Sequence, residues 1–280
     1  MSDGLLSRLP ASPLARPERT PGPPSALARS LRHAAAPLAA RWLARDTGRR
    51  AFLRQVAEAA PRFDGRSPGV LAEALPTLRR RLLAEGFADP VLAEAFALLR
   101  ALSQAVLGLR HHDEQLLGAR LLMRGRLAEM ATGEGKSLTA ATGAACAALA
   151  GVPVHLVTVN DYLAERDALE MAPLYRALGL RAAHATANVD EAGRRAAYAA
   201  SVTYCDNKIL VFDYLRDRLR LGAAQARREA CLRELEQGGL AGGLLLRGLH
   251  FAIVDEADSV LVDEARTPLI LSGPGRPDGS

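Results

Sequence analysis

The stretch Thr132-Gly133-Glu134-Gly135-Lys136-Ser137 decides the interpretation of this sequence, because it places two glycines directly before a lysine and a hydroxyl residue. Glycines at these positions let backbone N–H groups crowd around phosphate oxygens, and a helix that starts at the lysine adds its positive N-terminal end. The lysine is one of only two in the chain, Lys136 and Lys208, among 36 basic residues. A compact ammonium fits such a nest of N–H groups where a planar guanidinium would not. The segment therefore predicts a phosphate-binding loop.

The match to the usual phosphate-loop pattern is partial. That pattern has a further glycine five residues before Gly135, and Met130 stands there. The helicase-like variant A-x-T-G-x-G-K-[ST] also fits only in part, because Ala131 is directly adjacent to Thr132. A glycine-rich turn without a ligand is the alternative interpretation. If the loop does bind phosphate, the Ser137 hydroxyl is the expected Mg²⁺ ligand.

A second motif, Phe251-Ala252-Ile253-Val254-Asp255-Glu256-Ala257-Asp258, is an apolar run that ends in acidic residues. Asp255 would lie at the carboxyl end of a buried strand, where open parallel sheets bind their ligands. From there Asp255 can orient the water shell of Mg²⁺, and Glu256 can polarise an attacking water. The alternative is a solvated, acidic helix start. The two motifs together predict an ATP site.

The pattern between the motifs alternates strands with helices. The predicted strands are Leu127–Met130, Val152–Val159, Leu180–Ala185, Ser201–Tyr204 and His250–Val254. The predicted helices are Lys136–Leu149, a helix capped by Asn160 or Asp161 that Gly179 stops, and most of residues 208–239. Apolar residues at three- and four-residue spacing predict helices over Leu71–Leu109, with a separate one from Pro90 to Leu107. We expect an α/β fold whose parallel sheet is covered by helices on both faces, preceded by a helical segment.

Composition limits the remaining classes. A chain of 280 residues, 49% hydrophobic, can bury a sizeable core, and its net charge of +5 permits but does not require contact with nucleic acid or acidic lipid. The three cysteines are far apart, so we expect neither a disulfide scaffold nor a zinc site. The sequence has no run of about 18 apolar residues, so we expect no membrane span. It also begins without the apolar region of a signal peptide. Residues 1–47 are rich in Pro, Ala and Arg, and we expect them to be disordered or weakly ordered, as a bacterial extension rather than an organellar transit peptide.

The segment Arg110-His111-His112-Asp113-Glu114-Gln115 lies upstream of the phosphate loop. The Gln115 amide has the donor and acceptor needed to pair with an adenine edge, although an isolated glutamine is more often a surface residue.

Three long stretches resemble the SecA family of bacterial preprotein-translocation ATPases. They are Val157–Asp167 (VTVNDYLAERD), Phe212–Asp217 (FDYLRD) and Val254–Pro274 (VDEADSVLVDEARTPLILSGP). The resemblance covers roughly residues 60 to 274. It implies a RecA-like P-loop NTPase fold of the helicase type, and it implies that Arg110–Gln115 is the adenine-recognition motif.

By this resemblance, residues 48–110 are a helical lead-in, 111–274 the first nucleotide-binding motor domain, and 275–280 the start of a preprotein-binding insertion. The implied cofactors are ATP or ADP with Mg²⁺. The implied partners are the SecYEG channel, preproteins and acidic phospholipids, with a homodimer also expected and no specific nucleic acid. The implied location is the cytoplasm and the cytoplasmic face of the inner membrane. Within the nucleotide site, the resemblance assigns roles to Thr132, Gly133, Glu134, Gly135, Lys136, Ser137, Gln115, Asp255 and Glu256.

Some positions depart from the family pattern. His112 stands where an aromatic is usual, Ser137 replaces the commoner threonine, and Val211 replaces a glycine. Two other functions therefore stay open. One is an RNA helicase fragment, because residues 255–258 spell D-E-A-D, although no Ser-Ala-Thr motif follows and only 4% of residues are aromatic. The other is a nucleotide-binding relic without catalytic activity. The isolated chain is expected to hydrolyse ATP weakly or not at all.

Overall fold

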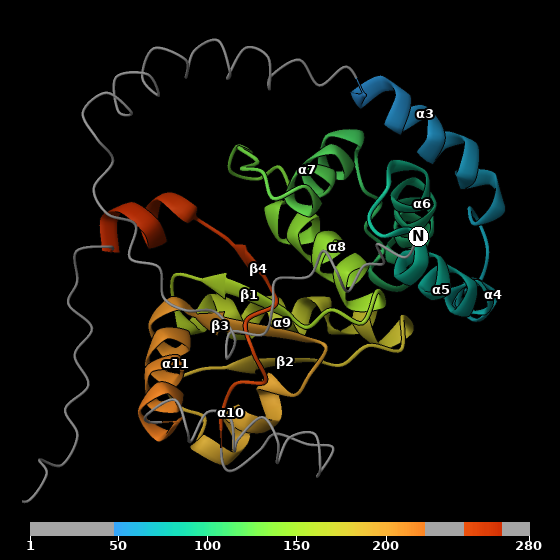
Figure 1. Cartoon of the computed structure of the whole chain (residues 1–280). Coiled ribbons are helices and arrows are strands. Elements are labelled where there is room, and N and C mark those ends of the chain that lie inside the picture. Colours follow the sequence, from blue (N-terminus) through green and yellow to red (C-terminus); the bar gives the residue numbers. More distant parts are fainter. Residues whose placement is uncertain (1–47, 222–243, 265–280) are drawn as a thin grey trace, which may run out of the picture.

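A four-stranded parallel sheet forms the centre of the α/β part of the molecule (Figure 1). The structure is a computed structural model, and it describes residues 48–221 and 244–264. The strands are β1 (Val154–Thr158), β2 (Ala182–Ala185), β3 (Val202–Asp206) and β4 (Phe251–Val254), in the order β2-β3-β1-β4. In the register of the sheet, Leu156 of β1 pairs with Tyr204 of β3 on one side and Ile253 of β4 on the other.

Helices cover both faces of this sheet, as the sequence predicts. Leu156, Tyr204 and Ile253 point into the large core that α8 (Lys136–Leu149) and α9 (Asp161–Ala177) complete. Alternate strand residues such as Val157 and Cys205 point the other way. They pack with residues of α10 (Glu191–Tyr198) and α11 (Asn207–Leu221).

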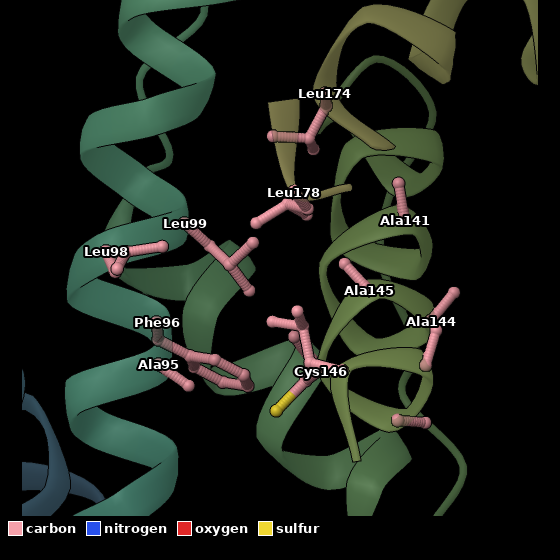
Figure 2. Close-up of a cluster of buried hydrophobic side chains, with 14 of the residues drawn as sticks. Ala95, Phe96, Leu98, Leu99, Ala141, Ala144, Ala145, Cys146, Leu174 and Leu178 are labelled. Atoms are coloured by element: carbon pink, nitrogen blue, oxygen red, sulfur yellow. The ribbon is translucent and has the colours of Figure 1, made fainter. Parts of the chain in front are cut away.

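The helical segment before the sheet packs on the face that carries α8 and α9. Its elements are α3 (Arg49–Ala59), the 3₁₀ turn η2 (Ala60–Arg62), α4 (Pro68–Glu73), α5 (Leu75–Glu85), α6 (Asp89–Leu107) and α7 (Asp113–Met123). In Figure 2, Phe96 and Leu99 of α6 point toward Cys146 of α8 and Leu178 at the end of α9. Fully buried alanines on α8, among them Ala141 and Ala145, let the three helices approach closely.

Helix α6 is, among the described residues, the one helix long and apolar enough to cross a membrane. The sequence predicted this helix from Pro90 to Leu107, but no membrane-spanning run was expected from it. Eleven of its residues are buried and ten of these belong to the core, so its apolar character is accounted for by packing against its neighbours.

The predicted ends of the helices agree with local backbone chemistry. The Asn160 side chain accepts a hydrogen bond from the Leu163 backbone N–H at 2.9 Å, which caps α9. Gly179 takes a positive φ of 65° where that helix stops.

The predicted strand at Leu127–Met130 is wrong. Gly125, with a φ of 64°, turns the chain after α7, and residues 126–131 then run as irregular backbone into the phosphate loop. Leu127 is 81% exposed, so no neighbouring strand covers it. A segment of four residues does not form a strand without a partner for its backbone hydrogen bonds. The predicted features of residues 1–47, 222–239 and 275–280 lie outside the described residues.

Candidate nucleotide-binding site

The loop before α8 has the backbone of an anion-binding nest. Gly133 and Gly135 have φ angles of 87° and 79°, values that favour glycine. The Glu134 carboxylate accepts a hydrogen bond from the Ala131 backbone N–H at 2.8 Å, which closes the loop on itself. Helix α8 has no acidic residue in its first turn and no side-chain cap at Gly135. Its first N–H groups are therefore available to an anionic ligand.

Lys136 and Ser137 are the first two residues of α8, and both are half-buried. Within the described residues Lys136 forms no ion pair with a carboxylate, so its ammonium is available to a phosphate. The Ser137 hydroxyl lies 3.3 Å from the Oδ2 atom of Asp167, a buried carboxylate on α9. Because α9 begins just after β1 ends, this contact puts the loop at the carboxyl edge of the sheet.

Gln115 connects the predicted adenine motif to the phosphate loop. Its Nε2 donates to the Glu134 carbonyl oxygen at 2.8 Å, and its Oε1 accepts from the His112 backbone N–H at 2.9 Å. The side chain is buried, which excludes the solvated-glutamine interpretation. A primary amide has two donors and two acceptor lone pairs, so one of each is left for a base.

Asp255 and Glu256 lie directly after β4 at the same edge. The Asp255 backbone N–H donates to the Val157 carbonyl oxygen at 2.8 Å, so it continues the sheet ladder by one bond. Glu256 is exposed and has a φ of 52°, which makes it the one non-glycine residue with positive φ in the described part of the chain. Its backbone N–H donates to the Asp255 carboxylate at 3.0 Å. Across residues 48–221 and 244–264, no hydrogen bond or ion pair joins these two acids to the loop.

Two polar residues that make contacts in this region were not predicted from the sequence. The first is Asp167. Its position on the buried side of α9, beside Ala164, Ala168 and Met171, could have indicated that it has a buried partner. The second is the buried His111, whose Nε2 lies 2.5 Å from the Thr142 hydroxyl of α8. Burial lowers the pKa of His111 to about 4, so the ring is neutral at pH 7.

The residues present fit a magnesium nucleotide. A Cβ built at Gly133 meets nothing within 4 Å, so space surrounds the loop backbone. The free N–H groups and the lysine suit phosphate oxygens, and hydroxyl and carboxylate oxygens are the ligands that Mg²⁺ prefers. With the parallel sheet, these features define a RecA-like P-loop nucleotide-binding domain.

Comparison with known proteins shows to which family this nucleotide-binding domain belongs. The family model described as "SecA DEAD-like domain" matches residues 41–280. Similar proteins include protein translocase subunit SecA 2 of Bordetella avium, 50% identical over 85% of this chain, and SecA 3 of Magnetococcus marinus, 48% identical over 80%. Protein translocase subunit SecA of Nitrosococcus oceani is 47% identical over 75% of the chain. The chain belongs to the SecA family and corresponds to its N-terminal motor-domain portion. The matches span 37%, 34% and 21% of the three relatives' own lengths.

Proposed function

We propose that this chain is the first nucleotide-binding domain of a SecA-type ATPase that couples ATP hydrolysis to preprotein translocation through SecYEG. The observation that supports this most strongly is the positive-φ loop at the uncapped start of α8, where Lys136 has no carboxylate partner among residues 48–221 and 244–264. The proposed domain is residues 111–274, with 48–110 as its helical lead-in and 275–280 as the start of an insertion.

The proposed division of roles follows the chemistry of each group. Lys136 and the N–H groups of Thr132–Ser137 hold the phosphates, and Gln115 holds the adenine edge. Ser137 binds Mg²⁺ directly, and Asp255 binds it through water. When bound, Mg²⁺ neutralises charge on the phosphate oxygens. Glu256, exposed beside Asp255, polarises the attacking water.

Calorimetric titration with Mg²⁺-ADP tests the binding site. The 280-residue chain should bind with a dissociation constant on the order of micromolar or weaker, because a two-domain nucleotide clamp would be only half present. Lys136→Ala should abolish the heat of binding. The chain's other lysine provides the matched control, since Lys208 pairs with Glu264 at 3.0 Å and takes no part in the loop. Equal binding by Lys136→Ala and Lys208→Ala would reject the site.

Hydrolysis by this chain alone should be weak. Phosphoryl transfer gains a factor of about 10³–10⁵ from an arginine at the γ-phosphate, and in this family we expect that arginine from a second motor domain. Adding a second motor domain in trans should raise turnover, and Glu256→Gln should remove the gain while nucleotide binding persists. Fast, Glu256-dependent turnover by the 280 residues alone would contradict the proposed architecture.

The proposed partners are SecYEG, preproteins and acidic phospholipids, and the proposed location is the cytoplasm and the cytoplasmic face of the inner membrane. A homodimer is also proposed. The competing function is an RNA helicase, which the D-E-A-D spelling of residues 255–258 favours. ATPase stimulation separates the two. Translocon vesicles with preprotein should stimulate the full-length product, whereas stimulation by single-stranded RNA alone would favour the helicase.

A further inference from the structure

A buried carboxylate lies directly behind the phosphate loop. Asp167 is 2% exposed, and its two oxygens have different partners. Oδ1 accepts from the Arg166 Nε and Nη2 atoms at 2.9 and 2.6 Å. Oδ2 lies 3.3 Å from the Ser137 hydroxyl, the proposed Mg²⁺ ligand. One oxygen is thus paired with Arg166 from the solvent side, and the other faces the loop.

Packing alone does not call for a charge at this position. The neighbours of Asp167 on the buried stripe of α9 are Ala164, Ala168 and Met171. Removing a carboxylate from water is costly unless its partners compensate for the loss. Arg166 compensates incompletely, because its side chain is 39% exposed and its attraction is therefore screened. An apolar residue would fill the stripe without this cost.

We propose that Asp167 is a positioning residue that accepts a hydrogen bond from the Ser137 hydroxyl and makes the site prefer magnesium-bound nucleotide to metal-free nucleotide. A serine hydroxyl has one proton and two lone pairs. Donating its hydrogen bond to Asp167 turns the lone pairs of the Ser137 hydroxyl toward the cation and fixes the rotamer of the ligand, as hydrogen-bonded outer residues do in metal sites. The inference rests on the proposed nucleotide site.

The charge of Asp167 acts in the same direction as its hydrogen bond. A carboxylate behind the loop attracts a divalent cation and repels the excess negative charge of a free nucleotide. At 3.3 Å the contact with Ser137 is longer than the usual 2.7–2.8 Å of O–H···O bonds. A hydroxyl whose oxygen is bound to a cation is a stronger donor, so this contact should strengthen with Mg²⁺ present.

The test compares ADP binding by the 280-residue chain in Mg²⁺ and in EDTA. Asp167→Asn keeps the shape and removes the charge. It should weaken Mg²⁺-ADP binding about 10- to 100-fold, the usual effect of losing an outer-shell partner, and leave metal-free ADP binding equal or tighter. Glu170→Gln is the matched control, because it makes the same chemical change at an exposed carboxylate of the same helix. Ser137→Ala combined with Asp167→Asn should lose little more than either variant alone.

The possible results distinguish the proposed role of Asp167 from a purely structural one. Equal losses in Mg²⁺ and in EDTA would make Asp167 a purely structural residue, and additive losses in the double variant would separate it from Ser137. If Asp167→Asn does not fold, Arg166→Gln gives the second measurement, because it keeps the carboxylate and removes its outer partner. The magnesium preference should then persist or rise, and a fall would overturn the inference. Failure of the wild-type chain to bind any nucleotide would reject the nucleotide site itself, whereas binding that depends on Lys136 but not on Asp167 would reject only this inference.

Discussion

The Nε2 atom of Gln115 lies 2.8 Å from the carbonyl oxygen of Glu134, so the side chain predicted to recognise the base also holds the phosphate loop. Gln115 is buried, and its Oε1 is held by the His112 backbone. The amide therefore joins the start of α7 to the loop before α8. A base-recognition residue tied in this way should affect ligands that have no base.

Gln115→Ala should weaken binding of inorganic triphosphate as well as ATP, because the loop loses a hydrogen bond worth about 1 kcal/mol. Competition calorimetry with both ligands measures the two effects. Gln104→Ala is the control, since Gln104 is exposed and its Nε2 donates to the Gly108 carbonyl oxygen of its own helix end at 3.5 Å, away from the loop. Loss of ATP binding with unchanged triphosphate binding would restrict Gln115 to the base.

Gly135→Ala should destabilise the fold more than Gly151→Ala. Both glycines have positive φ, 79° and 75°, and an alanine in this region costs about 1–2 kcal/mol. A Cβ at Gly135 would also lie 2.3 Å from Gln115 Nε2, whereas one at Gly151 meets nothing within 4 Å. Urea unfolding measures the difference. Equal losses would mean that Gln115 moves aside without cost.

Asp89→Asn should cost about 3 kcal/mol, because Arg120 is 1% exposed and loses the carboxylate that it contacts at 2.8 and 3.0 Å. The hydrogen bond from Arg120 lowers the pKa of Asp89. The ionised Asp89 carboxylate therefore stabilises the fold at pH values above its pKa in the unfolded chain, about 4. This stabilisation is lost as the pH falls through the lower pKa of Asp89 in the folded chain. Urea unfolding from pH 7 to pH 3 should show a smaller acid loss in the variant.

Glu85→Gln is the control for that prediction. Its carboxylate pairs with Arg81 at 2.7 Å, and both side chains are substantially exposed. Solvent screens such a pair, so little stability should be lost. A loss equal to that of Asp89→Asn would argue that burial of Arg120 is not the cause.

His155 should make folding sensitive to mild acid. The ring is fully buried in β1, and neither nitrogen has a hydrogen-bond partner in the described residues. Burial lowers its pKa from 6.5 to about 4. The unfolded chain therefore binds a proton that the folded chain does not, and stability should fall by about 2 kcal/mol between pH 7 and pH 5. His155→Leu should remove this part of the pH dependence in urea unfolding and leave the part that His111 contributes, because the pKa of His111 is also lowered to about 4. An unchanged slope would contradict the assignment.

The sequence by itself determined most of the architecture. Apolar runs ending at Val159 and Val254 predicted parallel strands, and Asn160 and Gly179 marked the ends of α9 through chemistry that acts within a few residues. The phosphate loop was also evident locally, because glycine spacing and a rare lysine report backbone geometry and charge without reference to the rest of the chain. The family motifs at 157–167 and 254–274 were long enough to identify SecA.

Only the tertiary structure decided how distant polar groups meet. Leu127–Met130 was predicted as a strand before the phosphate loop, but no partner strand pairs with it in the described residues. The contacts of Gln115 with Glu134 and of Ser137 with Asp167 join residues 19 and 30 positions apart on different elements. Periodicity shows that Asp167 lies on the buried face of α9, but it does not show what lies opposite. That depends on how α8 and α9 pack, which is a property of the whole core.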